Sequence, residues 1–247
     1  MRFQVPGLRV KSLFFALCSM LFALCLVCSA FAAHPLITDD TGTQGKGNFE
    51  LEIGVEYAHK YGGGVKEKTI EIVPVLAYGI TDDIDIELCV PYQYIRIKDA
   101  ETIMTEDGIS DVEVDFKWRF YEKDGLSFAL RPLISLPTGD YEKGLGTGRV
   151  TYSLLLFVTK EAKPWEFDIN LGYKRNENKL GERKDIWHAS LASKVEVVKN
   201  LKVVADIGIE TNPDRSSNTY PAFFLGGLIY SLSKNFDIDF GIKAGLN

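Results

Sequence analysis

The stretch WEFDINLGYK, residues 165–174, has an apolar side chain at every second position. Phe167 and Ile169 alternate with Glu166 and Asp168. Because successive side chains of a β-strand point to opposite faces, this pattern predicts a strand with one apolar and one charged face. A soluble sheet would bury the apolar face, whereas a membrane barrel would turn it to lipid and keep the charges inside. The rest of the chain has to decide which face meets water.

The amino terminus has the features of a secretory signal peptide. Three basic residues precede an apolar run over residues 13–27, and small residues surround Ala32. We expect cleavage after Ala32, and an uncleaved inner-membrane anchor is the alternative because the run approaches spanning length. The predicted organisation is a signal peptide over 1–32 and a single barrel domain over 33–247.

Charge and cysteine content narrow the choice of partners and stabilising bonds. The net charge is −6 and becomes −9 once the predicted signal peptide, with three basic and no acidic residues, is removed. This acidity argues against nucleic acid as a partner. Three of the four cysteines lie in the predicted signal peptide, so Cys89 has no partner for a disulfide in the mature chain. A core or a closed hydrogen-bonded wall must hold the domain together.

Eleven segments of the alternating type follow one another from residue 48. Each is about ten residues long, which is the length a tilted strand needs to cross a bilayer, whereas soluble strands average about five or six. Segment length therefore favours the membrane. The predicted strands are 48–57, 69–78, 84–95, 111–121, 126–136, 150–159, 165–174, 186–197, 201–210, 220–232 and 236–246.

Short and long links alternate between these segments. The links after even-numbered segments are short, whereas those after odd-numbered segments are long and polar, as in 58–68 and 137–149. Outer-membrane barrels have short periplasmic turns and longer outer loops. Aromatic residues gather near both ends of the segments, as expected for two girdles at the headgroup level, although aromatics are also good strand formers. The predicted fold class is an all-β, transmembrane, antiparallel up-and-down β-barrel.

Two features depart from a regular closed barrel. Pro74, Pro91 and Pro132 lie inside predicted strands, where proline removes a ladder hydrogen bond, so we expect bulges, bends or misplaced boundaries there. Single-chain bacterial barrels also have even strand numbers. About 12 strands are therefore expected, and the 11 found predict either a missed strand or a chain truncated before the twelfth.

Two regions resemble a known family of outer-membrane barrels. Residues 108–140, GISDVEVDFKWRFYEKDGLSFALRPLISLPTGD, and residues 34–54, HPLITDDTGTQGKGNFELEIG, are similar to the "Putative MetA-pathway of phenol degradation" family. The most specific pieces are 39–45, 117–119 and 137–140. The resemblance covers nearly all of the mature chain and implies a transporter-like barrel linked to the degradation of aromatic compounds. This chain departs from the family pattern in lacking a last strand with a terminal aromatic residue.

With the apolar faces toward lipid, the charged faces would line the lumen. Fifteen acidic residues against seven basic ones require either water or neutralising ion pairs. We interpret the lumen as a hydrated, acid-leaning passage that favours cations or neutral polar solutes. The alternative is a salt-bridged plug that only holds the wall together, since a barrel of about 12 strands lies between filled and open sizes. The lumen-lining candidates are Glu50, Glu52, Glu71, Asp85, Glu87, Glu113, Asp115, Lys117, Arg119, Arg131, Glu166, Asp168, His188, Lys194, Asp206, Asp237 and Asp239.

Two motifs that suggest cofactor sites fail on inspection. Four oxygen-bearing residues between Asp39 and Glu50 fall at calcium-loop positions, but Gln44 stands where glycine is needed and no helices are predicted to flank the loop. The glycine-rich stretch 144–149 lacks the lysine and hydroxyl ending of a phosphate loop, so a flexible outer loop is predicted. No metal and no cofactor are predicted.

His188 and Ser190 are two residues apart and therefore on one face of a predicted strand. A twelve-stranded outer-membrane phospholipase uses such a pair with an asparagine that orients the histidine. Here the serine is not followed by the asparagine and glycine of that family, and no orienting partner can be named. The chain is therefore predicted not to be an enzyme, with no catalytic residues, and lipid hydrolysis stays an unfavoured alternative.

The predicted function is an outer-membrane channel or transporter for small solutes. A preference for aromatic, phenol-type compounds follows from the family resemblance alone. A structural or surface-interaction barrel that acts through its outer loops is the second alternative. The predicted partners are outer-membrane lipid and a small-molecule solute, the predicted location is the outer membrane of a Gram-negative cell, and no oligomeric state is predicted.

Overall fold

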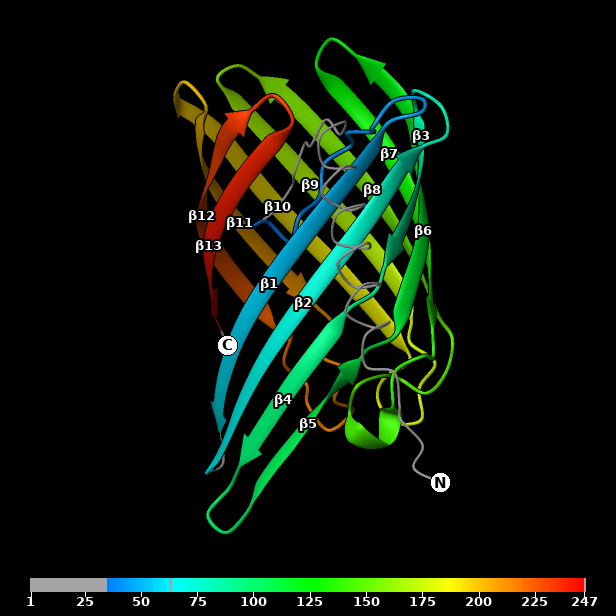
Figure 1. Cartoon of the computed structure of the whole chain (residues 1–247), viewed down its shortest axis with the longest axis vertical. Coiled ribbons are helices and arrows are strands. Elements are labelled where there is room, and N and C mark those ends of the chain that lie inside the picture. The colour runs from blue at the N-terminus through cyan, green and yellow to red at the C-terminus, as the bar shows by residue number, and fades with distance from the viewer. Residues whose placement is uncertain (1–34, 63, 247) are drawn as a thin grey trace, which may run out of the picture.

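The computed structural model describes residues 35–62 and 64–246, and antiparallel strands dominate it (Figure 1). The predicted signal peptide lies outside the described residues. Thirteen strands form one sheet in the order β13-β12-β11-β10-β9-β8-β7-β6-β3-β2-β4-β5, with β1 paired to β2. The predicted all-β antiparallel fold is confirmed. In the described residues no helix is long and apolar enough to cross a membrane.

The strands are β1 (Phe49–Gly62), β2 (Val65–Gly79), β3 (Ile84–Cys89), β4 (Tyr92–Lys98), β5 (Ile103–Ile109), β6 (Val112–Lys123), β7 (Leu126–Leu136), β8 (Thr151–Ala162), β9 (Trp165–Arg175), β10 (Asp185–Val198), β11 (Leu201–Glu210), β12 (Ala222–Ser233) and β13 (Phe236–Gly245).

The thirteen strands occupy eleven positions around the sheet. The predicted strand 84–95 is divided at Pro91 into β3 and β4, which pair with different parts of β2. The next position of the sheet is also shared by two strands, since β6 pairs with β3 and β5 pairs with β4. Pro74 of β2 lies between the residues that pair with β4 and those that pair with β3, and its carbonyl accepts a hydrogen bond from Val90 N at 3.2 Å. Both prolines therefore lie at a break in the ladder, where a missing N–H costs least.

Two predicted loops contain strand. β1 and β2 stay in register from Ala58↔Thr69 to Gly62↔Val65, so most of 58–68 extends the hairpin beyond its expected length. β5 lies inside 98–110, the long polar link between the predicted strands 84–95 and 111–121. The prediction was wrong here because both segments are rich in charged residues, and solvated strand ends have no apolar face that would set them apart from loops.

The sheet curls until its two edge strands meet. Lys243 Nζ of β13 lies 3.0 Å from Glu56 Oε1 of β1. Outward side chains beside this seam are unusually exposed, at 70% for Val55 and 65% for Phe240, compared with 41% for Ile169 in the middle of the sheet. They lack a neighbouring strand on one side. The result is a barrel with a seam between β1 and β13 (Figure 1).

Strand β9 shows which face is covered. Its apolar residues Ile169 and Leu171 are 41% and 51% exposed, whereas Asp168 and Asn170 are 0% and 2% exposed. A soluble sheet would have the opposite arrangement. The apolar face is the outer surface, and the charged face points into the barrel, as in membrane barrels.

Candidate functional site in the barrel interior

A segment that precedes the first strand lies inside the barrel. We call residues 35–48 the inner segment. Its residues Leu36, Thr38 and Thr41 are only 6%, 0% and 3% exposed, although they belong to no strand. The segment starts against β10 to β12 and ends at the turn between β2 and β3, where Thr43 Oγ1 donates to Asp82 O at 2.8 Å. It therefore crosses the interior from one wall to another.

The first anchor of the inner segment is a carboxylate on β11. Asp206, 1% exposed, accepts hydrogen bonds from Ile37 N and Thr38 N, both at 2.8 Å, and from Thr38 Oγ1 at 2.6 Å. Beside it, Leu36 packs into a small apolar cluster on the inner wall, which comprises Ala192, Val204, Leu225 and Ile229. This cluster is the apolar part of the anchorage.

Asp39 in the middle of the segment binds two cations of the wall. Arg131 Nη1 lies 2.8 Å and Lys117 Nζ 3.3 Å from its carboxylate. Both cations also lie over the buried ring of Phe157, at 5.0 and 5.5 Å from its centroid. Asn170 holds the backbone of the same residue, accepting from Asp39 N at 2.8 Å and donating to Asp39 O at 2.7 Å. The wall thus fixes both the charge and the peptide of Asp39.

Asp40 is bound from the other side of the barrel. Lys194 Nζ of β10 lies 2.8 Å from Asp40 Oδ2, 2.8 Å from Glu166 Oε1 and 3.2 Å from Asp168 Oδ2. Lys194 itself is 4% exposed. One buried ammonium therefore joins the inner segment to two carboxylates of β9, and its removal would leave them without a counter-charge.

The end of the inner segment is held by hydroxyl groups, by carboxylates that accept hydrogen bonds from it, and by close backbone contacts. Thr41 N donates to Thr159 Oγ1 at 3.1 Å, and the Thr41 hydroxyl contacts the hydroxyl of Ser127. Gln44 N donates to Asp85 Oδ2 at 2.9 Å, and the Gln44 amide also donates to Glu50. At Gly79 a Cβ atom would lie 1.9 Å from the Gly45 carbonyl oxygen, so only glycine lets β2 approach the segment.

The structure gathers many of the predicted lumen residues around the inner segment. Asp85, Lys117, Arg131, Lys194 and Asp206 contact it directly. Glu50 also accepts a hydrogen bond from Gln44 of the segment. Glu166 and Asp168 contact Lys194, and Glu87 lies 3.7 Å from Arg131. The other predicted lumen residues have different surroundings. Arg119 binds Asp83 and Glu122 near a short turn, and Glu71 accepts a hydrogen bond from Gln93. Asp115 is buried, Asp239 is exposed, and the half-buried residues are Glu52, Glu113, His188 and Asp237.

The inner segment was not predicted from the sequence as a structural element. Residues 39–45 entered only through the family resemblance and a rejected calcium motif. Asp39 is held by two cations, and no group of three or more His, Cys, Asp or Glu side chains in 35–62 and 64–246 could hold a metal ion. The inward-facing positions of the strands did contain a signal for a bound segment. Basic residues stand there among acidic ones, and uncharged polar residues also occur; they are Lys117, Arg131, Lys194, Ser127, Thr159 and Asn170.

A sequence model of the family described as "Putative MetA-pathway of phenol degradation" matches residues 35–247. The chain belongs to this family. The match begins at Pro35, so the inner segment is part of the family's common domain. The predicted resemblance is confirmed.

One solved structure has the same fold. The "COG4313 outer membrane channel from Pseudomonas putida F1" aligns with a TM-score of 0.69 and 14% identity, over 84% of this chain and 91% of that one. A "CymD monoaromatic hydrocarbon channel" aligns with a TM-score of 0.49 and 10% identity, over 81% of this chain and 75% of that one. No curated protein sequence matches. The fold of this family member is that of an outer-membrane β-barrel channel.

The structure brings the His188 and Ser190 pair together without completing a triad. His188 Nε2 lies 3.0 Å from Ser190 Oγ, and Ser190 is 6% exposed. In the described part of the chain, no carboxylate or amide is hydrogen-bonded to His188. A hydrolytic serine needs a histidine that a third group orients. The pair therefore lacks the third, orienting group of a hydrolytic triad in the described part of the chain.

The long loops form an ordered rim at the end of the barrel opposite the short turns. Arg183 links two of them by donating to Asn212 O at 3.0 Å and Ser217 O at 3.2 Å. The glycine-rich loop 144–149 is closed by Asp111, which accepts from Thr147 N at 2.8 Å and from Gly139 N at 3.0 Å. A hydrogen bond from Lys184, followed by one from Arg175, lowers the pKa of Glu177. These contacts hold the loops of the rim to one another and to the strand ends.

Proposed function

We propose that this protein is an outer-membrane channel for small solutes, and that the inner segment is a plug that must move to open it. The observation that carries the proposal is the way the segment crosses the interior, bound to strands on several sides of the wall. Channel fold and family membership support it. The segment stands where a solute would have to pass.

The contacts of the inner segment suit a plug that can leave and return. Apart from Pro35 and Leu36, it is held by hydrogen bonds and ion pairs rather than by an apolar core. Each hydrogen bond contributes about 0.5–1.5 kcal/mol net, because water can replace either partner. Once the segment is displaced, the wall presents Asn170, Thr159 and Lys117, which water solvates readily. The vacated passage would be polar and hydrated.

The solute class that we propose is small aromatic compounds of the phenol type. The family description names phenol degradation, and this is the support for an aromatic solute. The interior adds one restriction. Buried acids at Asp85, Asp115, Asp168 and Asp206 disfavour anions, so a neutral phenol would pass more readily than a phenolate or a benzoate.

The proposal is tested by solute block of ion current. We would reconstitute the purified protein in a planar bilayer and add phenol, with cyclohexanol at the same concentration as the matched control. Phenol is expected to reduce the ion current in a concentration-dependent way and cyclohexanol to do so less. A conducting protein that responds equally to both would contradict the aromatic preference, and a protein without any conductance would contradict the channel.

A structural barrel without transport is the second candidate, and one observation favours it. Lys117, Arg131 and Lys194 are all paired to the inner segment or to neighbouring acids. If that network never opens, the segment is a permanent brace of the wall. Exchanging the outer loops would then change the protein's role, whereas transport would survive the exchange if the lumen is the functional part.

We further propose export by the signal peptide over 1–32, which leaves a single barrel domain over 33–247. Sequencing the amino terminus of protein from outer-membrane fractions should find Ala33 first. A retained residue 1 in the membrane-inserted protein would contradict cleavage.

A further inference from the structure

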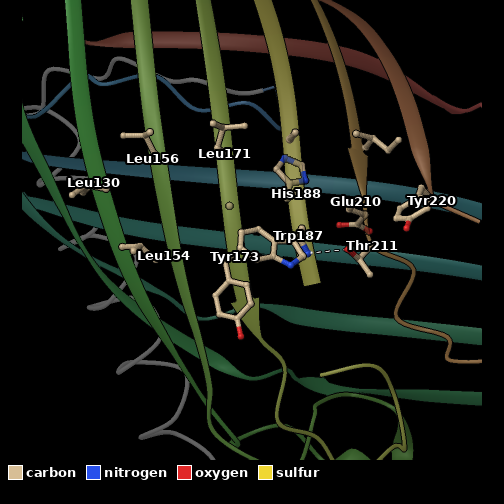
Figure 2. Close-up of a pocket in the computed structure, with 13 residues that line it drawn as sticks. Leu130, Leu154, Leu156, Leu171, Tyr173, Trp187, His188, Glu210, Thr211 and Tyr220 are labelled. Atoms are coloured by element: carbon tan, nitrogen blue, oxygen red, sulfur yellow. Dashed lines mark hydrogen bonds between the residues drawn. The ribbon is translucent and has the colours of Figure 1, made fainter. Parts of the chain in front are cut away.

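An apolar groove lies on the outer surface of the barrel, away from the inner segment (Figure 2). Its volume is about 780 Å³ and its lining is almost entirely apolar. Five strands contribute to it. The lining includes the side chains of Leu154, Leu156, Leu171, Trp187, Ile209 and Tyr220.

The groove exists because one small residue interrupts a row of large ones. Cross-strand pairing aligns Leu130, Leu156, Leu171, Ala189 and Ile209 across β7 to β11. Ala189 is the one short side chain in this row. Large side chains surround that gap, so the surface is hollowed above it.

The end of the groove nearest the long loops carries aromatic rings and charges. Tyr173 and Trp187 are cross-strand partners with ring centroids 4.8 Å apart. Tyr173 Oη donates to Asp185 at 2.7 Å, and Asp185 in turn binds Arg175 at 2.8 Å. Amphipathic rings of this kind lie at the headgroup level of a membrane. The groove therefore begins at the interface and extends into the apolar band.

Basic side chains stand just beyond these rings. The side chains of Arg175 and Lys184 remain 41% and 39% exposed despite their ion pairs. Loops 175–185 and 211–219 together carry five basic residues against four acidic ones, on a chain whose net charge is −6. This part of the rim thus offers two partly exposed basic side chains, Arg175 and Lys184, to a phosphate group.

We propose that the groove is a binding site for one acyl chain of the phosphorylated glycolipid of the outer leaflet, with a phosphate at Arg175 and Lys184. The chain would lie along Leu171 and Ile209 over Ala189, where the groove is continuous with the lipid-facing surface. The groove volume is within the range of about 300–1,000 Å³ typical of small-ligand sites. The inference rests on the proposed outer-membrane location but not on transport, so a protein that does not conduct could still bind the lipid.

The test is native mass spectrometry of protein extracted from outer membranes, using Ala189→Trp and the matched control Leu191→Trp. Both positions face outward on β10, but only Ala189 lines the groove. Wild type and Leu191→Trp should retain the glycolipid, and Ala189→Trp should retain at least fivefold less. Equal retention by all three proteins would overturn the proposal.

A second pair of variants tests the phosphate contact. Arg175→Gln with Lys184→Gln should lower glycolipid retention severalfold, while Lys160→Gln, at the short-turn end of β8, should not. Retention of ordinary phospholipid in place of the glycolipid, unchanged by the double substitution, would overturn the assigned ligand. Heat-modifiable gel migration of every variant shows whether it is folded, and the conductance assay separately tests the channel.

Discussion

Lys194 is the residue on which the charges of the interior converge. Its ammonium faces Asp40, Glu166 and Asp168, and the side chain is almost completely buried. Removing one partner of a buried ion pair typically costs about 3–5 kcal/mol, because the remaining charges lose their counter-ion. Lys194→Met should therefore lower the free energy of unfolding by about that amount, measured by urea titration in detergent micelles.

Lys202→Met is the matched control for this change. Lys202 also belongs to the inward register, one strand further along, but no ion pair with it is found among the described residues. It should change the unfolding free energy by less than about 0.5 kcal/mol. Equal losses in both variants would contradict the role given to Lys194.

The two faces of β9 give a second prediction. Ile169→Arg places a charge on the lipid-facing surface, at a cost of about 2–4 kcal/mol near the bilayer midplane. We expect the heat-modifiable, folded fraction in outer membranes to fall sharply. Asp168→Asn keeps the size and the hydrogen bond from Thr159, so it should insert normally. Normal insertion of Ile169→Arg would contradict the assignment of the faces.

For single residues, the sequence predicted which face of a strand each side chain occupies, but it did not predict the ion-pair partners. Alternation is a local property of a strand, so it shows that Asp168 and Ile169 point to opposite sides. It does not show which residue lies opposite Asp168 in space. Lys194 and Asp40 are 26 and 128 positions away in the chain, and only the closed sheet brings them together.

The rim elements carry a pH dependence. Hydrogen bonds from Lys184 and Arg175 lower the pKa of Glu177. A carboxylate with a lowered pKa in the folded state contributes stability that is present above its unfolded pKa, about 4, and is lost as pH falls through the lower folded value. The loop 175–185 should therefore keep its order at neutral pH and loosen below about pH 4.

Hydrogen exchange measures this effect. Protection of Asn176 N, which donates to Lys184 O, should fall as pH drops from 5 to 3. Glu161 N, which donates to Gly125 O at 2.7 Å beside a short turn, is the internal control and should keep its protection. Constant protection in the loop would contradict the contribution of these ion pairs.

Prediction of the elements depended on whether an apolar face was present. Membrane-crossing parts of the strands were found, because they have that face. The extended ends of β1 and β2, and the whole of β5, were missed for the lack of it. The inner segment was missed for a different reason, since an extended chain bound by side chains of the wall has no periodicity of its own.

Across the whole molecule, strand length and loop asymmetry were sufficient to predict an outer-membrane barrel. Both features reflect the thickness and sidedness of a membrane, so they can be read from the chain without tertiary contacts. The content of the lumen could not be predicted in this way. The excess of inward acids left an open passage and a filled one equally possible, and the structure places the inner segment there.

In the proposed function, movement of the inner segment opens the channel. Thr41 and Ser127 have hydroxyls in contact, so a disulfide between Thr41→Cys and Ser127→Cys is within geometric reach and would tie the segment to β7. Cys89, the free buried cysteine, is replaced by alanine so that no other thiol remains in residues 35–62 and 64–246. The measurement is ion conductance in a planar bilayer, before and after reduction.

The oxidised protein should be nearly closed, and reduction should raise its conductance severalfold to the level of the cysteine-free protein. The Thr41→Cys single variant should not respond to the reductant. If the oxidised and reduced double variants conduct equally well, solutes pass without movement of the inner segment, and the account of the interior as a plugged channel is contradicted.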